Sequence, residues 1–187
     1  MRTLISLILF GVLLGYEQIA EPSTIQKTSA ITEQTGHYAI NPQFVAVKEF
    51  SEGLAAVRIG DKWGFIDKQG TIVINPQFSH TIPFREGLAA VRVGDDKTGK
   101  WGFIDKQGTM VINPQFSSAL SFQEGLAPVH IGDDKTGNWG FIDKRGTIVI
   151  NPQFDSATRI FEGGFREGLA MVRIGDDKTG KWGFINR

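Results

Sequence analysis

The sequence contains no cysteine among its 187 residues. This absence excludes disulfides, thiolate metal sites, a cysteine nucleophile and a lipid-modified N-terminal cysteine. An excess of charge of either sign is also missing, because 20 Lys and Arg balance 20 Asp and Glu. Since no basic stretch could follow a phosphate backbone, we expect no nucleic-acid partner.

Long hydrophobic runs are missing as well. The longest covers residues 4–14 after Arg2, and a membrane-spanning helix needs about 20 apolar residues. We interpret residues 1–20 as a secretory signal peptide or, if uncleaved, as an N-terminal anchor. This predicts an exported protein, periplasmic or extracellular, that meets a membrane only through an uncleaved N-terminus. Residues 21–36 are polar and are expected to form a linker.

After residue 36 no stretch has a sustained helical period, so we expect almost no helix. Instead, three tetrapeptides recur four times in the same order. NPQF begins at residues 41, 75, 113 and 151, EGLA at 52, 86, 124 and 167, and WGFI at 63, 101, 139 and 182. A period near 38 residues predicts a repeat array whose neighbouring units share a core.

Each unit contains three segments typical of strands, rich in β-branched or aromatic residues and bounded by Gly or Pro. In the first unit they are GLAAVRIG at 53–60, KWGFID at 62–67 and TIVINPQF at 71–78. The DKQG turn at 67–70 joins the last two as a hairpin. Pro76, Pro114 and Pro152 cannot donate to a sheet, so they should end the third strand or lie on an edge. The unit is predicted to be a three-stranded meander.

Tandem KWGFIDKQGTIVINPQF with an upstream EGLA closely resembles the WG-repeat family, named for its Trp-Gly pair and common in bacterial proteins. The resemblance covers residues 37–187 in four copies. It implies an all-β repeat array with no known catalytic residue to carry over. We also expect no cofactor and no metal site.

The array could be open or closed. WGFINR at 182–187 has no third strand after it, and HYAINPQF at 37–44 is a third strand without a clear WGFI partner. The two segments could pair and close a propeller-like ring of four units. However, SAITEQTG at 29–36 aligns with WGFIDKQG, so a degenerate second strand at 30–33 could serve residues 37–44. We therefore expect an open, twisted array of three-stranded meanders, with the ring as the alternative.

The four tryptophans are the main candidate residues, either structural or ligand-stacking. A Gly follows each, and its missing side chain lets an indole or backbone from an adjacent unit pack closely. We expect a stacked internal file of Trp63, Trp101, Trp139 and Trp182, and an exposed platform for sugar rings is the alternative. The inter-repeat core should be completed by Phe44, Phe78, Phe116, Phe154, Leu54, Leu88, Leu126 and Leu169.

The glutamates of EGLA pose a similar choice. Two suitably spaced carboxylates could hydrolyse a glycoside, but one Glu beside a Gly in every unit favours a turn or backbone-capping role for Glu52, Glu86, Glu124 and Glu167. His37, His80 and His130 fall at non-equivalent positions and are expected at the surface or on an edge. No nucleophile elbow, Ser/His/Asp signature or Rossmann pattern is present, so we expect no enzyme.

GDDKTGK at residues 94–100 partly matches a phosphate-binding loop. Such a loop must lead from a strand into a helix. Here strands are expected on both sides, and Trp101 occupies the Ser/Thr position. The segment is predicted to be a solvated hairpin turn without nucleotide, and loose cation binding by its aspartates is the alternative.

Together these features predict a non-catalytic, exported interaction module for a protein or an envelope polymer. The alternative is an envelope glycan-binding or glycan-cleaving protein, which needs exposed Trp or converging Glu side chains.

Overall fold

A computed structural model describes residues 37–95, 97–133, 136–159 and 162–187. The interpretations of residues 1–20 and 21–36, and of a degenerate strand at 30–33, lie outside these residues. The chain divides into two compact units, Met1–Tyr38 and Ala39–Arg187, and the second is described here. Among the described residues, no helix has the length and apolarity to cross a membrane.

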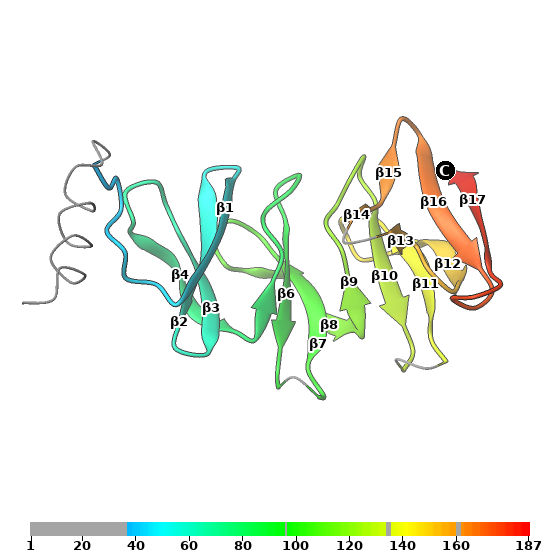
Figure 1. Ribbon diagram of the computed structural model, residues 1–187, viewed down its shortest axis with the longest axis horizontal. Helices are drawn as coiled ribbons and strands as arrows, with labels where there is room; N and C mark the ends of the chain where they lie inside the picture. The colour runs from blue at the N-terminus through cyan, green and yellow to red at the C-terminus, as the bar shows by residue number, and fades with distance from the viewer. Residues whose placement is uncertain (1–36, 96, 134–135, 160–161) are drawn as a thin grey trace, which may run out of the picture. The chain divides into compact units, whose positions relative to one another are not determined.

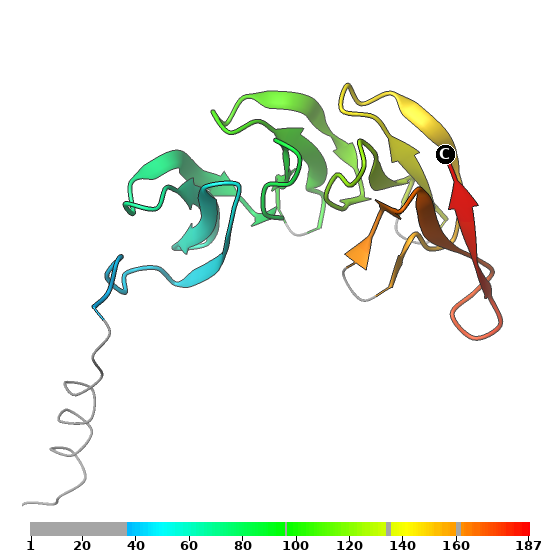
Figure 2. The same ribbon diagram turned by 90° about the horizontal axis from the view of Figure 1, so that it is seen from above.

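The second unit consists of antiparallel sheets that follow one another in chain order (Figures 1 and 2). The first sheet contains β1 (Ala46–Ser51), β2 (Leu54–Ile59), β3 (Lys62–Ile66) and β4 (Ile72–Phe78). The second contains β5 (His80–Thr81), β6 (Ala89–Val93), β7 (Lys100–Ile104) and β8 (Met110–Phe116). The third contains β9 (Ser118–Ala119), β10 (Ala127–Ile131), β11 (Asn138–Ile142) and β12 (Ile148–Phe154). The fourth contains β15 (Phe165–Arg166), β16 (Leu169–Ile174) and β17 (Lys181–Asn186), and a small hairpin of β13 (Thr158–Arg159) and β14 (Glu162–Gly163) precedes it.

The expectation of an open all-β array is confirmed. The meander was predicted one strand short, because β1, β5 and β9 add a first strand to three of the sheets. Two of these added strands span only two residues, which is too short for a pattern to appear in the sequence. The ring alternative is wrong for the described residues: β17 pairs with β16 alone, and Ile40 packs on the first sheet instead.

The Trp-Gly pair shapes the edge of the first three sheets, as the first one shows. Trp63 pairs with Phe78 and Phe65 pairs with Ile74, so Gly64 faces a bulge of three residues, 75–77. A Cβ on Gly64 would lie 2.4 Å from the carbonyl oxygen of Ile74. The close neighbour is therefore the backbone of the next strand in the same sheet, where we had expected an adjacent unit. Pro76 does not end β4; it lies in the bulge on an edge strand, which was the second of the two expected outcomes.

The hydrophobic core lies between successive sheets. Leu54, Ala56 and Phe65 of the first sheet form one cluster with Phe84, Val91 and Ile104 of the next unit. Phenylalanines form the aromatic contacts across these boundaries, with ring centroids 4.9 Å apart for Phe65 and Phe84, 4.9 Å for Phe103 and Phe122, and 5.2 Å for Phe141 and Phe165.

Most of the expected core residues are buried: Phe78, Phe116, Phe154, Leu54, Leu88 and Leu126. Phe44 is partly buried against the first sheet. The prediction that Leu169 belongs to the core is wrong, because its side chain is 47% exposed. Its side chain lies on the outer face of the last sheet, where no described residue of a following unit covers it.

Candidate functional site

Each EGLA motif begins with a tight turn. Glu52 and Gly53 have φ angles of 52° and 92°, and the residues that flank them, Ser51 and Leu54, pair across the hairpin. Positive φ at both central residues is the mark of a type I′ turn. That turn normally takes Asn or Asp first, and Glu in this region is uncommon. The same conformation recurs at Glu86, Glu124 and Glu167, so the predicted turn role is confirmed.

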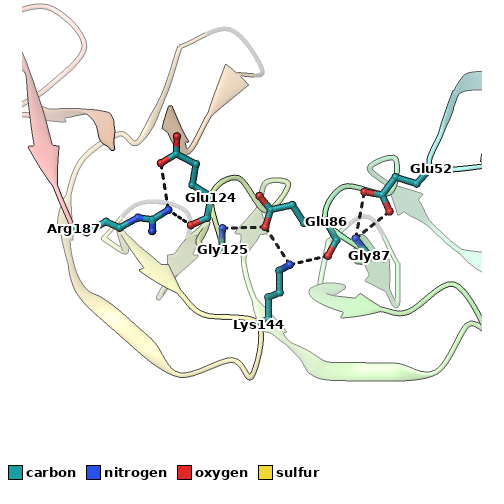
Figure 3. A network of polar contacts seen from close by, with 7 residues as sticks. All are labelled: Glu52, Glu86, Gly87, Glu124, Gly125, Lys144 and Arg187. Carbon is teal, nitrogen blue, oxygen red and sulfur yellow. Dashed lines mark hydrogen bonds and ion pairs between the residues drawn. The ribbon is translucent and has the colours of Figure 1, made fainter. Parts of the chain in front are cut away.

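The carboxylates reach from one unit to the next (Figure 3). Glu86 Oε2 accepts a hydrogen bond from the backbone N–H of Gly125 at 3.0 Å and lies 3.2 Å from Lys144 Nζ. Lys144 also donates to the Glu86 carbonyl oxygen at 2.9 Å. We call this set of contacts the Glu ladder. Its other members are Glu52 with Gly87 and Lys106, and Glu124 with Gly168 and Arg187.

The capping role was predicted for these glutamates, but the partners were not. Lys106 and Lys144 follow the aspartate after WGFI, and Arg187 occupies the matching position in WGFINR. A cation that recurs with the same period as Glu was the available signal. It gave no indication of which unit each Glu would contact, because that depends on how the sheets stack.

The ladder changes the titration of Glu52. Burial alone would raise the pKa of its carboxyl group, but hydrogen bonds from Lys106 and Gly87, together with attraction to the Lys106 charge, lower that pKa below its ordinary value. The ionised form is therefore favoured in the folded chain. Carboxylates held in this way act as links between units. Their partners in the ladder are backbone N–H groups and cations.

The tryptophans pack at the rim of the core. Trp63, Trp101 and Trp139 are half-buried, and each contacts one of the clusters between sheets. Trp182 is 42% exposed. The expected Trp file is replaced by the Phe contacts described above. Trp63 and Phe65 lie on the same face of β3, but Phe65 is fully buried in the cluster with Phe84, whereas Trp63 is only partly buried against that cluster.

Cations or imidazoles of the chain lie against the indoles. The Trp63 ring has Lys48 Nζ at 5.0 Å and the Arg58 guanidinium at 6.0 Å. The Arg173 guanidinium lies 5.7 Å from Trp182, and the His130 ring lies 5.4 Å from Trp139. Such contacts stabilise an indole within the chain. They leave less of its surface for a sugar ring, so the platform alternative gains no support.

His80 is exposed on the short edge strand β5, and His37 is exposed, as expected. The prediction that His130 lies at the surface or on an edge is wrong, because it is half-buried in β10, an inner strand of the third sheet. Its Nδ1 lies 2.6 Å from Ser117 Oγ.

GDDKTGK forms the predicted hairpin turn between β6 and β7. Asp95 Oδ1 accepts hydrogen bonds from the backbone N–H of Thr98 at 2.6 Å and of Lys97 at 2.8 Å. These bonds lower the pKa of Asp95. The carboxylate therefore caps its own turn, and in the described part of the chain no group of three or more His, Asp or Glu could hold a metal ion.

A groove crosses the units beside the Glu–Gly turns. It has a volume of about 420 Å³ and is lined by residues 48–51, 82–85, 120–121 and 123, with Gly163 and Arg166. Three of its residues are cations, Lys48, Arg85 and Arg166, and Glu49 is its one acidic residue. Burial lowers the pKa of Lys48, which a bound anion would oppose. The groove can therefore take an extended ligand that carries negative charge.

Comparison with curated proteins found no match to the chain. The family model described as WG containing repeat matches it four times, at residues 33–63, 63–97, 101–133 and 139–178. These matches cover well over half of the sequence and coincide with the recurring turn and sheet motifs. The chain therefore belongs to the family of WG-containing repeat proteins.

Proposed function

We propose that this protein is a non-catalytic, exported interaction module that binds an extended, negatively charged segment of a protein or envelope polymer along the groove. The observation that carries the proposal is the composition of that groove. Residues from the same stretch of successive units line it, so one elongated ligand could contact several units at once.

Charge supports an anionic ligand. The Arg85 side chain is exposed, and Arg166 donates to Gln123 Oε1 at 3.1 Å on the same wall. Guanidinium groups suit carboxylate and phosphate partners because their N–H groups form a fixed fork. The whole chain is neutral overall, so attraction would be local to the groove.

Photo-crosslinking tests the binding. A benzophenone amino acid at Ser121 in the groove of the full chain should capture a partner from native extract, and Arg85→Glu should reduce the yield severalfold. The same probe at Val149, an exposed residue outside the groove lining, is the matched control. Equal capture at Ser121 and Val149, or capture unaffected by Arg85→Glu, would reject the groove as the binding surface.

Export rests on residues 1–20 and is a separate part of the proposal. A leader of this type directs a chain out of the cytoplasm and leaves the repeat unit on the far side of the membrane. The groove would then face periplasmic or extracellular partners.

A further inference from the structure

The outer face of the last sheet differs from the equivalent faces inside the array. Phe184 is 70% exposed, whereas its counterparts Phe65, Phe103 and Phe141 are 0% exposed. Together with Leu169, Met171 and Glu167, Phe184 lines a hollow of about 340 Å³. At each inner boundary the aromatic ring of the next unit packs at this place, as Phe84 does against Phe65. An exposed apolar face of this kind indicates a surface that another protein segment can cover.

The same sheet lacks a strand. In the other three sheets β4, β8 and β12 pair with the WGFI strand, but among the described strands β17 pairs only with β16. The space beside the glycine differs accordingly. A Cβ on Gly64 would lie 2.4 Å from the Ile74 oxygen, whereas one on Gly183 would meet nothing within 4 Å. An open strand edge is a template for another strand.

Residues 39–44 offer the missing strand. AINPQF has the sequence of the end of β4, yet none of the ladders between described strands includes it. Ile40 and Phe44 pack on Ala55, Val57 and Ile66. Ile74 and Phe78 do the same on Ala89, Val91 and Ile104 of the next unit. The segment is thus placed as the edge strand of a preceding sheet.

The remaining contacts of a unit boundary are also split between the two ends. Phe50 aligns with Phe84 but is 44% exposed, where Phe84 is 1% exposed. Lys68 aligns with Lys106, and Gly53 with Gly87. Glu167 has the φ of a ladder glutamate, 55°. In the described residues no ladder contact reaches Lys68, Gly53 or Glu167. The last sheet therefore holds the acceptor, the Glu167 carboxylate, and the first sheet holds the donors, the Gly53 N–H and the Lys68 amine.

We propose that two copies of this chain bind head to tail, with the last sheet of one copy against the first unit of the other. Residues 39–44 of the second copy pair with β17, its Phe50 enters the hollow beside Phe184, and its Gly53 N–H and Lys68 bind Glu167. Each contact repeats one that the chain already forms between its own units. Such an interface is heterologous, so it continues from copy to copy. Phe50, Gly163 and Arg166 also line the groove, but the assembly needs no ligand bound there.

Sedimentation of the full chain in mild detergent tests the assembly. The wild type should form oligomers that grow with concentration. Phe184→Asp and Gly183→Ala should each raise the dissociation constant by at least about 30-fold, as expected for loss of a central aromatic anchor or for a clash with the incoming backbone. Both substitutions fall on an exposed edge, so the circular dichroism spectrum should stay unchanged. Val149→Asp is the control and should assemble as the wild type does.

A mixing experiment tests the polarity of the interface. Phe50→Asp blocks one end and Phe184→Asp the other, so each variant alone should be monomeric and an equimolar mixture should give a 1:1 dimer. Wild type that stays monomeric up to about 100 µM, well above the dissociation constant of a weak interface, would overturn the proposal. Oligomers that persist in Phe184→Asp and Gly183→Ala, or a mixture that stays monomeric, would also overturn it.

Discussion

The carboxylate of Glu86 accepts a hydrogen bond from the backbone N–H of Gly125, 39 residues further along the chain, at 3.0 Å. The side chain of one unit thus accepts a hydrogen bond from a backbone N–H in the turn of the next unit. The contact accounts for a Glu at a left-handed position that Asn or Gly would occupy with less strain. A longer side chain is needed there to reach the neighbouring turn.

The first prediction concerns this link. Glu86→Ala should lower the free energy of unfolding by about 1–2 kcal/mol more than Glu167→Ala. Glu86 has a hydrogen bond and an ion pair to lose, and no described residue forms such a contact with Glu167. Both residues have the same backbone conformation, so the difference isolates the ladder. Urea unfolding, at concentrations where the chain is monomeric, measures this difference in the free energy of unfolding. Equal losses in the two variants would show that the ladder does not stabilise the array.

The second prediction concerns the Trp-Gly pair. Gly102→Ala should destabilise the chain by at least about 2 kcal/mol, since the added Cβ must displace backbone. That Cβ would lie 2.5 Å from the Ile112 oxygen. Gly183→Ala is the matched control and should change stability by less than about 0.5 kcal/mol, because nothing lies within 4 Å of its Cβ. Thermal unfolding of both variants, at concentrations where the chain is monomeric, is the measurement. A tolerated Gly102→Ala would contradict the close approach.

The third prediction is a pH dependence. The folded-state pKa of Glu52 is lowered from the ordinary value of 4.5. Its carboxylate therefore contributes stability that is present above that value and is lost as the pH falls through the folded pKa. Glu52→Gln should reduce the loss of stability on acidification below about pH 5. Denaturant titrations across this range, with Glu167→Gln as the control, are the test; an unchanged acid profile in Glu52→Gln would be the contrary result.

The fourth prediction concerns the turn at residues 94–100. Replacing GDDKTGK with the GDK of the first unit should leave the fold intact, because closure entropy changes slowly with loop length. The variant loses the bond from Arg92 Nε to the Gly99 oxygen at 3.2 Å. Arg58 Nε, beside the short turn of the first unit, is buried without a hydrogen-bond partner in the described residues. We expect a cost of about 1 kcal/mol; global unfolding of the variant would show that the turn is structural.

The fifth prediction concerns export. Fractionation with mass spectrometry of the N-terminus should find the chain outside the cytoplasm, either shortened near residue 20 or membrane-bound with residues 1–20 retained. A soluble cytoplasmic chain with an intact Met1 would contradict the proposal.

The sequence by itself determined the strands of the EGLA, WGFI and NPQF motifs, the turns and the number of units, but not the first strands β1, β5 and β9. Alternating apolar residues, Gly at positive φ and Pro on an edge are local requirements, and each recurs four times or nearly so. They predicted the hairpin at 67–70, the capping role of Glu52 and the burial of Phe78 without knowledge of the stacking.

Only the tertiary structure decided how the units meet. Phe65 and Phe184 occupy the same position of the same motif, yet one is fully buried and the other is 70% exposed. Leu54 and Leu169 differ in the same way. Burial depends on whether another sheet lies against the residue, and that is a contact between segments far apart in the chain. The same dependence made Phe, and not Trp, the file between sheets, and it set Gly125 and Lys144 as the partners of Glu86.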